Sequence, residues 1–126
     1  MATPAVYELL EQRTAGDNTV SVAAMVESIV GCKWSMSLLG LIARGVVRPS
    51  CFLRECSGLS AKVMNERLRK MVRFGLITRT VRGENPPLEV RYMLTSFGSQ
   101  FVRLLDEIQR LQAQFDERER MASPRE

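Results

Sequence analysis

The chain has 126 residues, of which 45% are hydrophobic and 25% charged, and its formal net charge is +4. This length and composition predict one globular domain, and no apolar run approaches the ~18 residues that a membrane span requires. The N-terminus lacks a basic region followed by an apolar one, so no secretory signal is predicted. The three cysteines are odd in number and not densely spaced, which favours a reducing compartment. We therefore expect a cytoplasmic protein.

Three helices are predicted in the first third of the chain. Thr3-Pro4 is a suitable helix start, because proline is favoured at the first helical position. A second helix is predicted over about 21–30 and a third over about 33–44. The third is apolar over a wide arc, so we expect it to be the central buried helix. The β-prone residues 46–48 that follow predict a short third strand beside a later hairpin.

A helix-turn-helix pair comes next in the sequence. A short helix, capped by Ser50, is predicted through Cys56, and the next helix, 60–74, can begin with Ser60 as its N-cap and end at Gly75. One face of the second helix is apolar and should meet the core, through Met64, Leu68 and Met71. The opposite face carries Lys62, Asn65, Glu66, Arg69 and Arg73.

A β-hairpin follows this helix at once. Residues 76–82 and 88–94 have strand character, and the turn between them is rich in glycine and proline. We therefore predict an α+β fold that is mainly α, a winged helix-turn-helix with a two- or three-stranded wing. The helix over 60–74 is interpreted as an element that reads DNA.

The last predicted helix is long, covers about 96–117 and can be capped by Thr95. The spacing of its apolar residues is close to a heptad repeat, which would form a seam along one side of the helix. These residues are Phe101, Leu104, Leu105, Ile108, Leu111 and Phe115. The seam could pack back on the same domain or form a dimer interface. We favour the dimer, because the helix is too long to be covered by so small a body. The dimer helices would be about 4–30 and 96–117 within a single domain, 1–118, and residues 119–126 are expected to be a disordered tail.

Positive charge is concentrated in the predicted helix and hairpin. Residues 60–82 contain seven bases and one acid, a net charge of +6, so the other 103 residues carry −2 of the total +4. A basic run is often only a solvated helix face. Here the strand that continues from the helix is also basic, which favours a nucleic-acid interface.

Short segments in a fixed order extend over about residues 21–105. They are Ile29-Val30-Gly31-Cys32-Lys33-Trp34, Arg48, Phe52, Leu53, Gly58-Leu59-Ser60, Leu68, Gly75-Leu76, Pro86-Pro87, Val90-Arg91-Tyr92, Leu94-Thr95 and Gly98. In order and spacing this set resembles the HxlR family of bacterial winged-helix transcription regulators, whose signature is Ile-Gly-Gly-Lys-Trp. The resemblance implies a homodimeric repressor or activator with the 60–74 helix in the major groove, the 76–94 wing along the backbone or the adjacent minor groove, and terminal helices in the dimer.

Three positions depart from the pattern of that family. Ser21 stands where many members carry a redox- or electrophile-sensing cysteine, so the thiol switch is not carried over. Cys32 replaces the second glycine of the signature. Arg91 replaces a glutamate, where it could add a phosphate contact or remove a salt bridge.

The candidate DNA-binding residues have distinct expected roles. Asn65 can pair with the edge of adenine and Arg69 with that of guanine, whereas Lys62 and Arg73 suit phosphate contacts. The helix N-terminus at Ser60 favours an anion. The complete predicted set is Ser60, Lys62, Asn65, Glu66, Arg69, Arg73 and Arg82.

Other basic residues are assigned away from DNA. Arg67 and Lys70 lie off the outward face, so intramolecular salt bridges or solvation are expected for them. Arg79 and Arg82 are three residues apart on a strand and must point to opposite faces. We choose Arg82, nearer the wing tip, as the residue that faces DNA.

Cysteine chemistry is the remaining candidate. Cys32, Cys51 and Cys56 could sense redox, or could be small buried hydrophobes. A zinc site is not expected with this spacing, and the chain has no histidine for a Cys-His nucleophile. No phosphate-binding loop or carboxylate pair is present, so we expect neither enzyme activity nor a cofactor, and nothing names an effector. The alternative function is a winged-helix module that binds an acidic protein and has only non-specific affinity for DNA.

Overall fold

The computed structural model describes residues 20–122, so the helix predicted from Thr3-Pro4 lies outside the described residues. The first described helix, α2, spans Val22–Gly31. Its N-cap is Ser21, whose Oγ accepts a hydrogen bond from the backbone N–H of Ala24 at 3.1 Å. The residue at the sensing-cysteine position of the resembled family therefore serves here as a helix cap.

Helix α3 spans Ser35–Ala43 and is the central helix, in contact with α2, α5, α6 and β2. Its expected burial is confirmed, because Leu38, Leu39, Leu41 and Ile42 are each at most 5% exposed. The helix begins two residues later than predicted, since Trp34 has a left-handed φ of 78°.

Helix α4 spans Pro49–Glu55 and helix α5 spans Ala61–Arg73. The expected cap of α4 was wrong. Arg48 is the N-cap and Pro49 occupies the first turn, which suits proline because its missing N–H would have had no helical partner there. The two helices and the turn between them form the predicted helix-turn-helix.

Strands β1, Ile77–Arg82, and β2, Glu89–Leu94, form an antiparallel sheet of two strands. Residues 46–48 are not a third strand. They make one backbone hydrogen bond to the hairpin, from the N–H of Tyr92 to the carbonyl of Val47 at 2.9 Å, because Pro49 starts a helix before a ladder can form. The wing thus has two strands, the smaller of the two predicted numbers.

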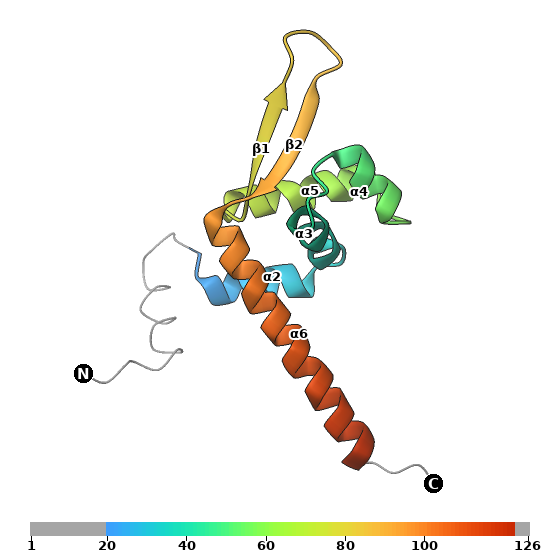
Figure 1. The fold of residues 1–126 in the computed structure, drawn as a ribbon, viewed down its shortest axis with the longest axis vertical. Helices are drawn as coiled ribbons and strands as arrows, with labels where there is room; N and C mark the ends of the chain where they lie inside the picture. The colour runs from blue at the N-terminus through green and yellow to red at the C-terminus, as the bar shows by residue number, and fades with distance from the viewer. Residues whose placement is uncertain (1–19, 123–126) are drawn as a thin grey trace, which may run out of the picture.

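Helix α6, Ser96–Ala122, is the longest element with 27 residues. It packs on α3 and β2 near its start and then extends away from the body, on the side opposite the hairpin (Figure 1). The disordered tail expected from residue 119 is wrong for residues 119–122, which continue the helix. Thr95 caps it as predicted, accepting a hydrogen bond from Gly98 N–H at 2.8 Å.

The described residues form one core with a mainly helical architecture and a two-stranded wing, as predicted. Its buried side chains come from five helices and both strands, and those that are 0% exposed include Ile29, Leu38, Phe52, Leu68, Met71 and Leu76. Among residues 20–122, no single helix is long and apolar enough to cross a membrane. Helices α2 and α3 taken together have that length and composition, but they are bent by 106° at their break.

Candidate nucleic-acid interface

Local rules explain where helix α5 begins and ends. The Ser60 hydroxyl accepts a hydrogen bond from the backbone N–H of Val63 at 3.2 Å, which satisfies one of the unpaired donors of the first turn. After the C-cap Phe74, Gly75 adopts a left-handed φ of 76°, a conformation that other residues rarely take. The chain then turns directly into β1.

Helix α5 is divided into a buried and an exposed face, as its period predicts. Met64, Leu68 and Met71 are 3%, 0% and 0% exposed and pack in the core. The opposite residues are all exposed and are Lys62, Asn65, Glu66, Arg69 and Arg73. A row of hydrogen-bonding side chains is therefore presented on one side of a helix whose other side is fixed by packing.

The two basic residues that were assigned away from DNA are held within the molecule. Arg67 Nε donates a hydrogen bond to the carbonyl of Lys33 at 3.1 Å. Lys70 Nζ donates to the hydroxyl of Ser28 at 3.1 Å. Their partners are neutral acceptors in and after α2 instead of the carboxylates expected for salt bridges. These bonds tie α5 to α2 and to the segment that follows α2.

A strained corner before α3 supports the turn between α4 and α5. Trp34 is the one non-glycine residue of positive φ among residues 20–122. Its ring lies beside Gly58, where an added Cβ would be 3.7 Å from Trp34 Cζ2. Lys33 Nζ is 5.2 Å from the centroid of the same ring, in cation–π range. Cys32 has an extended backbone with a φ of −105°, so no glycine is needed there.

The hairpin places its two arginines on opposite faces, as their spacing requires. Arg79 pairs with Tyr92 across the sheet and Arg82 pairs with Glu89. Arg79 shares its strand face with the buried Ile77, and together with Asn65 and Arg69 it lines a cleft between α5 and the wing. Arg79, which the sequence does not favour as a DNA contact, is therefore the arginine beside the polar face of α5. The burial of Ile77 two residues earlier is the signal that could have identified it.

Arg82 remains a predicted contact for the wing tip, but its strand face also carries an ion-pair cluster. Glu89 Oε1 accepts from Arg91 Nε at 2.9 Å and from Arg48 at 2.7 Å. The hydrogen bond from Arg91 lowers the pKa of Glu89, and the positive charge of Arg48 acts in the same direction. Arg91 thus makes a salt bridge within the chain.

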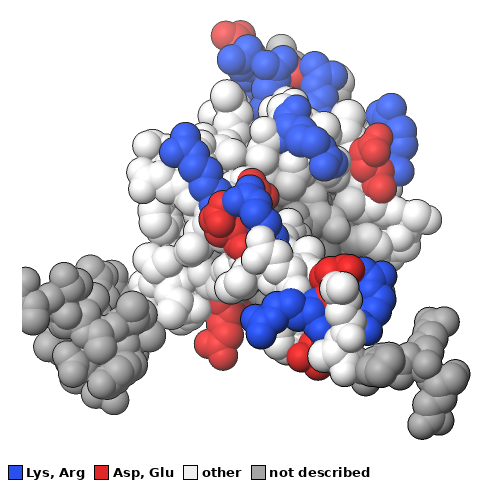
Figure 2. Space-filling model, turned by 60° about the horizontal axis from the view of Figure 1, so that its bottom comes forward, with Lys and Arg blue, Asp and Glu red and all other residues white. Residues whose placement is uncertain are grey.

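The charged side chains outside the basic segment are mixed in sign. Figure 2 shows one face of the molecule, on which acidic and basic residues are interspersed among broad uncharged areas. This face has no continuous basic surface. A mixed surface of this kind suits solvation, whereas the concentration of bases in residues 60–82 suits a polyanion.

The three cysteines are separate free thiols in the structure. Burial, with a smaller contribution from Glu55, raises the pKa of the Cys56 thiol, so less of the reactive thiolate forms there. Cys32 and Cys51 are half-buried, and the guanidinium of Arg54 lies 3.9 Å from Cys51 Sγ. The redox-sensing role stays a prediction, and Cys56 is chemically the least suited to it.

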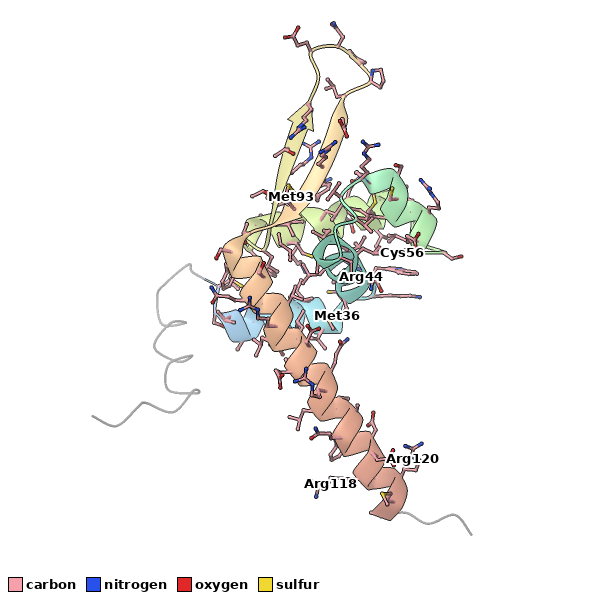
Figure 3. All side chains as sticks on the ribbon, viewed as in Figure 1. Met36, Arg44, Cys56, Met93, Arg118 and Arg120 are labelled. Carbon is pink, nitrogen blue, oxygen red and sulfur yellow. The ribbon has the colours of Figure 1, made fainter. Side chains whose placement is uncertain are left out.

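A second cleft lies between α3, the end of α4 and α6. It has a volume of about 560 Å³, and its lining includes Trp34, Met36, Arg44, Cys56, Leu105 and Asp106. Met36, Arg44 and Cys56 lie around α3 and the end of α4 in Figure 3. Residues 20–122 contain no group of three or more Cys, Asp or Glu side chains placed to hold a metal ion.

Comparisons with known proteins agree with this geometry. The chain matches the family described as HxlR-like helix-turn-helix over residues 29–120. It is 31% identical over 87 residues to the uncharacterized HTH-type transcriptional regulator YtcD of Bacillus subtilis, covering 69% of this chain and 68% of that protein. It is 32% identical over 94 residues to the uncharacterized HTH-type transcriptional regulator sll1512 of Synechocystis, covering 75% of this chain and 69% of that protein. A solved structure described as a transcriptional regulator of the MarR family from Enterococcus faecalis has a TM-score of 0.67 at 25% identity, covering 83% of this chain and 97% of that one.

Proposed function

The chain belongs to the HxlR-like helix-turn-helix family of transcriptional regulators, and from this premise we propose that it is a homodimeric, sequence-specific DNA-binding regulator that acts in the cytoplasm. One observation carries the proposal. The exposed polar face of α5 lies beside a basic wing, while the opposite face is fixed in the core. Such a helix can enter the major groove without any rearrangement of the domain.

The side chains of α5 divide into base readers and backbone contacts. Asn65 suits adenine and Arg69 suits guanine, and Glu66 can accept a hydrogen bond from the amino group of cytosine. Lys62 and Arg73, nearer the two ends of the helix, suit phosphates. Ser60 marks the helix N-terminus, where the remaining backbone N–H groups favour a phosphate.

Two copies of the chain would associate through the terminal helices. The first part of α6 is anchored by Phe101 and Leu105, which are 2% and 4% exposed. Farther along, Leu111 and Phe115 are 67% and 53% exposed on the part of the helix that extends from the body. Large apolar side chains in such a row favour a partner helix. A two-fold dimer would place two α5 helices about one turn of DNA apart, on an operator with two-fold symmetry.

Selection from a random duplex library tests this function. Bound fragments would be enriched, and the affinity of the selected site and of a scrambled control would be followed by fluorescence anisotropy across a salt series. We expect a symmetric site bound ~10³-fold or more above the control, with affinity falling steeply as salt rises. Equal and weak binding of both duplexes would contradict the proposal and favour the protein-binding alternative.

Arg69→Ala is expected to weaken binding of the selected operator by about 1–3 kcal/mol and to relax preference at one base pair of each half-site. The reason is the loss of a bidentate contact to a base edge. The measurement is a repeated selection with the variant. Arg44→Ala, which removes the same charge at the end of α3, is the control and should leave the selected sequence unchanged. An unchanged preference for Arg69→Ala would disprove the assignment.

A further inference from the structure

The cleft between α5 and the wing has the chemistry of an anion site. It has a volume of about 450 Å³ and is lined by Asn65, Arg69, Val72, Arg79 and Tyr92. Two arginines thus come together from a helix and a strand, and no acidic residue lines the cleft. Among residues 20–122, neither Arg69 nor Arg79 has a carboxylate within ion-pair distance. Two neighbouring cations without a counterion make the binding of an anion favourable.

Tyr92 adds a polar group to the same cleft. The residue as a whole is 5% exposed, but its hydroxyl oxygen is open to solvent, since the one enclosed side-chain oxygen or nitrogen without a partner among residues 20–122 is Ser35 Oγ. The residue is held in place by its backbone bond to Val47 and by its ring, which lies 6.2 Å from that of Phe52. The Tyr92 hydroxyl makes no hydrogen bond to any residue that the structure describes, so this donor is available to a ligand in the cleft that supplies acceptor oxygens.

We propose that this cleft binds one phosphate of the DNA backbone, where the recognition helix meets the wing. Arg79 is the main ligand, since its guanidinium can donate two parallel hydrogen bonds to a phosphate, and the Tyr92 hydroxyl donates a further one. The inference rests on the proposed DNA-binding function. DNA is the source of the phosphate, because the cleft adjoins Asn65 and Arg69 on the exposed face of α5, and the phosphate backbone flanks any helix in the major groove.

The expected role of this phosphate is to set the register of the protein on DNA. It would be held by residues from both α5 and the hairpin, so that the wing and the recognition helix engage the same strand together. Arg69, at the border of the cleft, would then be positioned to reach a base. Contacts of this kind position the protein but carry no sequence information.

The hairpin itself offers a matched control. Arg82 lies on the same strand as Arg79, is likewise exposed, and points to the opposite face, across from Glu89. Arg79→Ala and Arg82→Ala therefore remove the same charge from the same strand. Only the first changes the cleft. Both side chains are exposed, and circular dichroism should show the wild-type fold for each variant.

The test measures binding of the selected operator and of a scrambled duplex across a salt series. For Arg79→Ala we expect affinity for both duplexes to fall by a similar factor, about tenfold, and the slope of log K against log salt to fall by about one. Arg79→Lys should keep the slope, because it keeps the charge, while losing part of the affinity. Arg82→Ala should reduce affinity less than Arg79→Ala.

Neutralising single phosphates provides a second measurement. In operator duplexes with one methylphosphonate at a time, we expect one position per half-site where wild-type affinity falls and Arg79→Ala causes no further loss. Normal operator selectivity of the wild-type protein together with unchanged affinity of Arg79→Ala would overturn the phosphate site alone. A loss confined to one base pair would also overturn it, by making Arg79 a base reader. Wild-type binding without sequence preference would contradict the regulator function. The phosphate site would still be supported in that case if Arg79→Ala lowered the affinity for every duplex by the same factor.

Discussion

Replacing Gly98 with alanine is expected to lower the free energy of unfolding by about 3 kcal/mol or more. Gly98 is buried in the first turn of α6, and an added Cβ would overlap the carbonyl oxygen of Leu76 and come within 2.9 Å of its carbonyl carbon. This backbone cannot move easily. The Leu76 carbonyl accepts from Thr95 N at 3.0 Å, and Thr95 Oγ1 donates to the Gly75 carbonyl at 2.6 Å. The contact joins α6 to the segment that follows α5.

The measurement is denaturant unfolding followed by circular dichroism. Gly40→Ala is the matched control, because Gly40 also lies inside a helix but an added Cβ there would meet nothing within 4 Å. It should be neutral or raise stability by up to ~1 kcal/mol through helix propensity. Equal midpoints for the two variants would show that the approach of α6 to Leu76 does not constrain the fold.

Charging the distal seam of α6, by Leu111→Glu with Phe115→Glu, is expected to convert the proposed dimer to monomers and to reduce operator affinity by about 10²-fold or more. Both side chains are more than half exposed in the single chain, so the fold of each monomer should persist. Two carboxylates from each copy would be forced together in the dimer without partners. Operator affinity falls because the second half-site no longer benefits from the effective concentration that a dimer provides.

Light scattering after size-exclusion chromatography gives the mass, and anisotropy gives the affinity. The control is Gln109→Glu with Ala113→Glu, which adds the same charge at the same spacing on the opposite side of the helix. Both control positions are exposed. It should remain dimeric. A dimeric Leu111→Glu, Phe115→Glu variant would place the interface elsewhere, and a monomeric wild-type protein would contradict the dimer itself.

Helix α5 could be predicted from sequence because its signals are local. Its cap at Ser60, its end at Gly75 and the alternation of core and solvent faces all depend on residues within one turn of each other. The hairpin was predictable for the same reason, from two β-prone runs around a turn. Segments with weaker local signals were predicted less well. The short run at 46–48 has strand propensity, but it lacks the room to pair before Pro49.

The composition of the candidate interface could also be predicted, whereas part of its geometry could not. Side chains alternate between the two faces of a strand, so Arg79 and Arg82 had to point to opposite faces. Only the burial of Ile77 against the helices showed that Arg79 is the one that faces α5. Arg91 could have served as a phosphate ligand on sequence grounds alone. The structure pairs it with Glu89, which also binds Arg48 from a distant segment.

The order of the helices and the hairpin, the polar face of α5 and the family of the chain could all be predicted from sequence, because caps, periodicity and short motifs are properties of neighbouring residues. Which side chains meet across elements follows only from the packing of the fold. The left-handed Trp34 beside Gly58, the approach of Gly98 to Leu76 and the cleft that joins Arg79 to Arg69 are examples. Each depends on packing between segments far apart in the chain, where the free energy of burial overrides local preference.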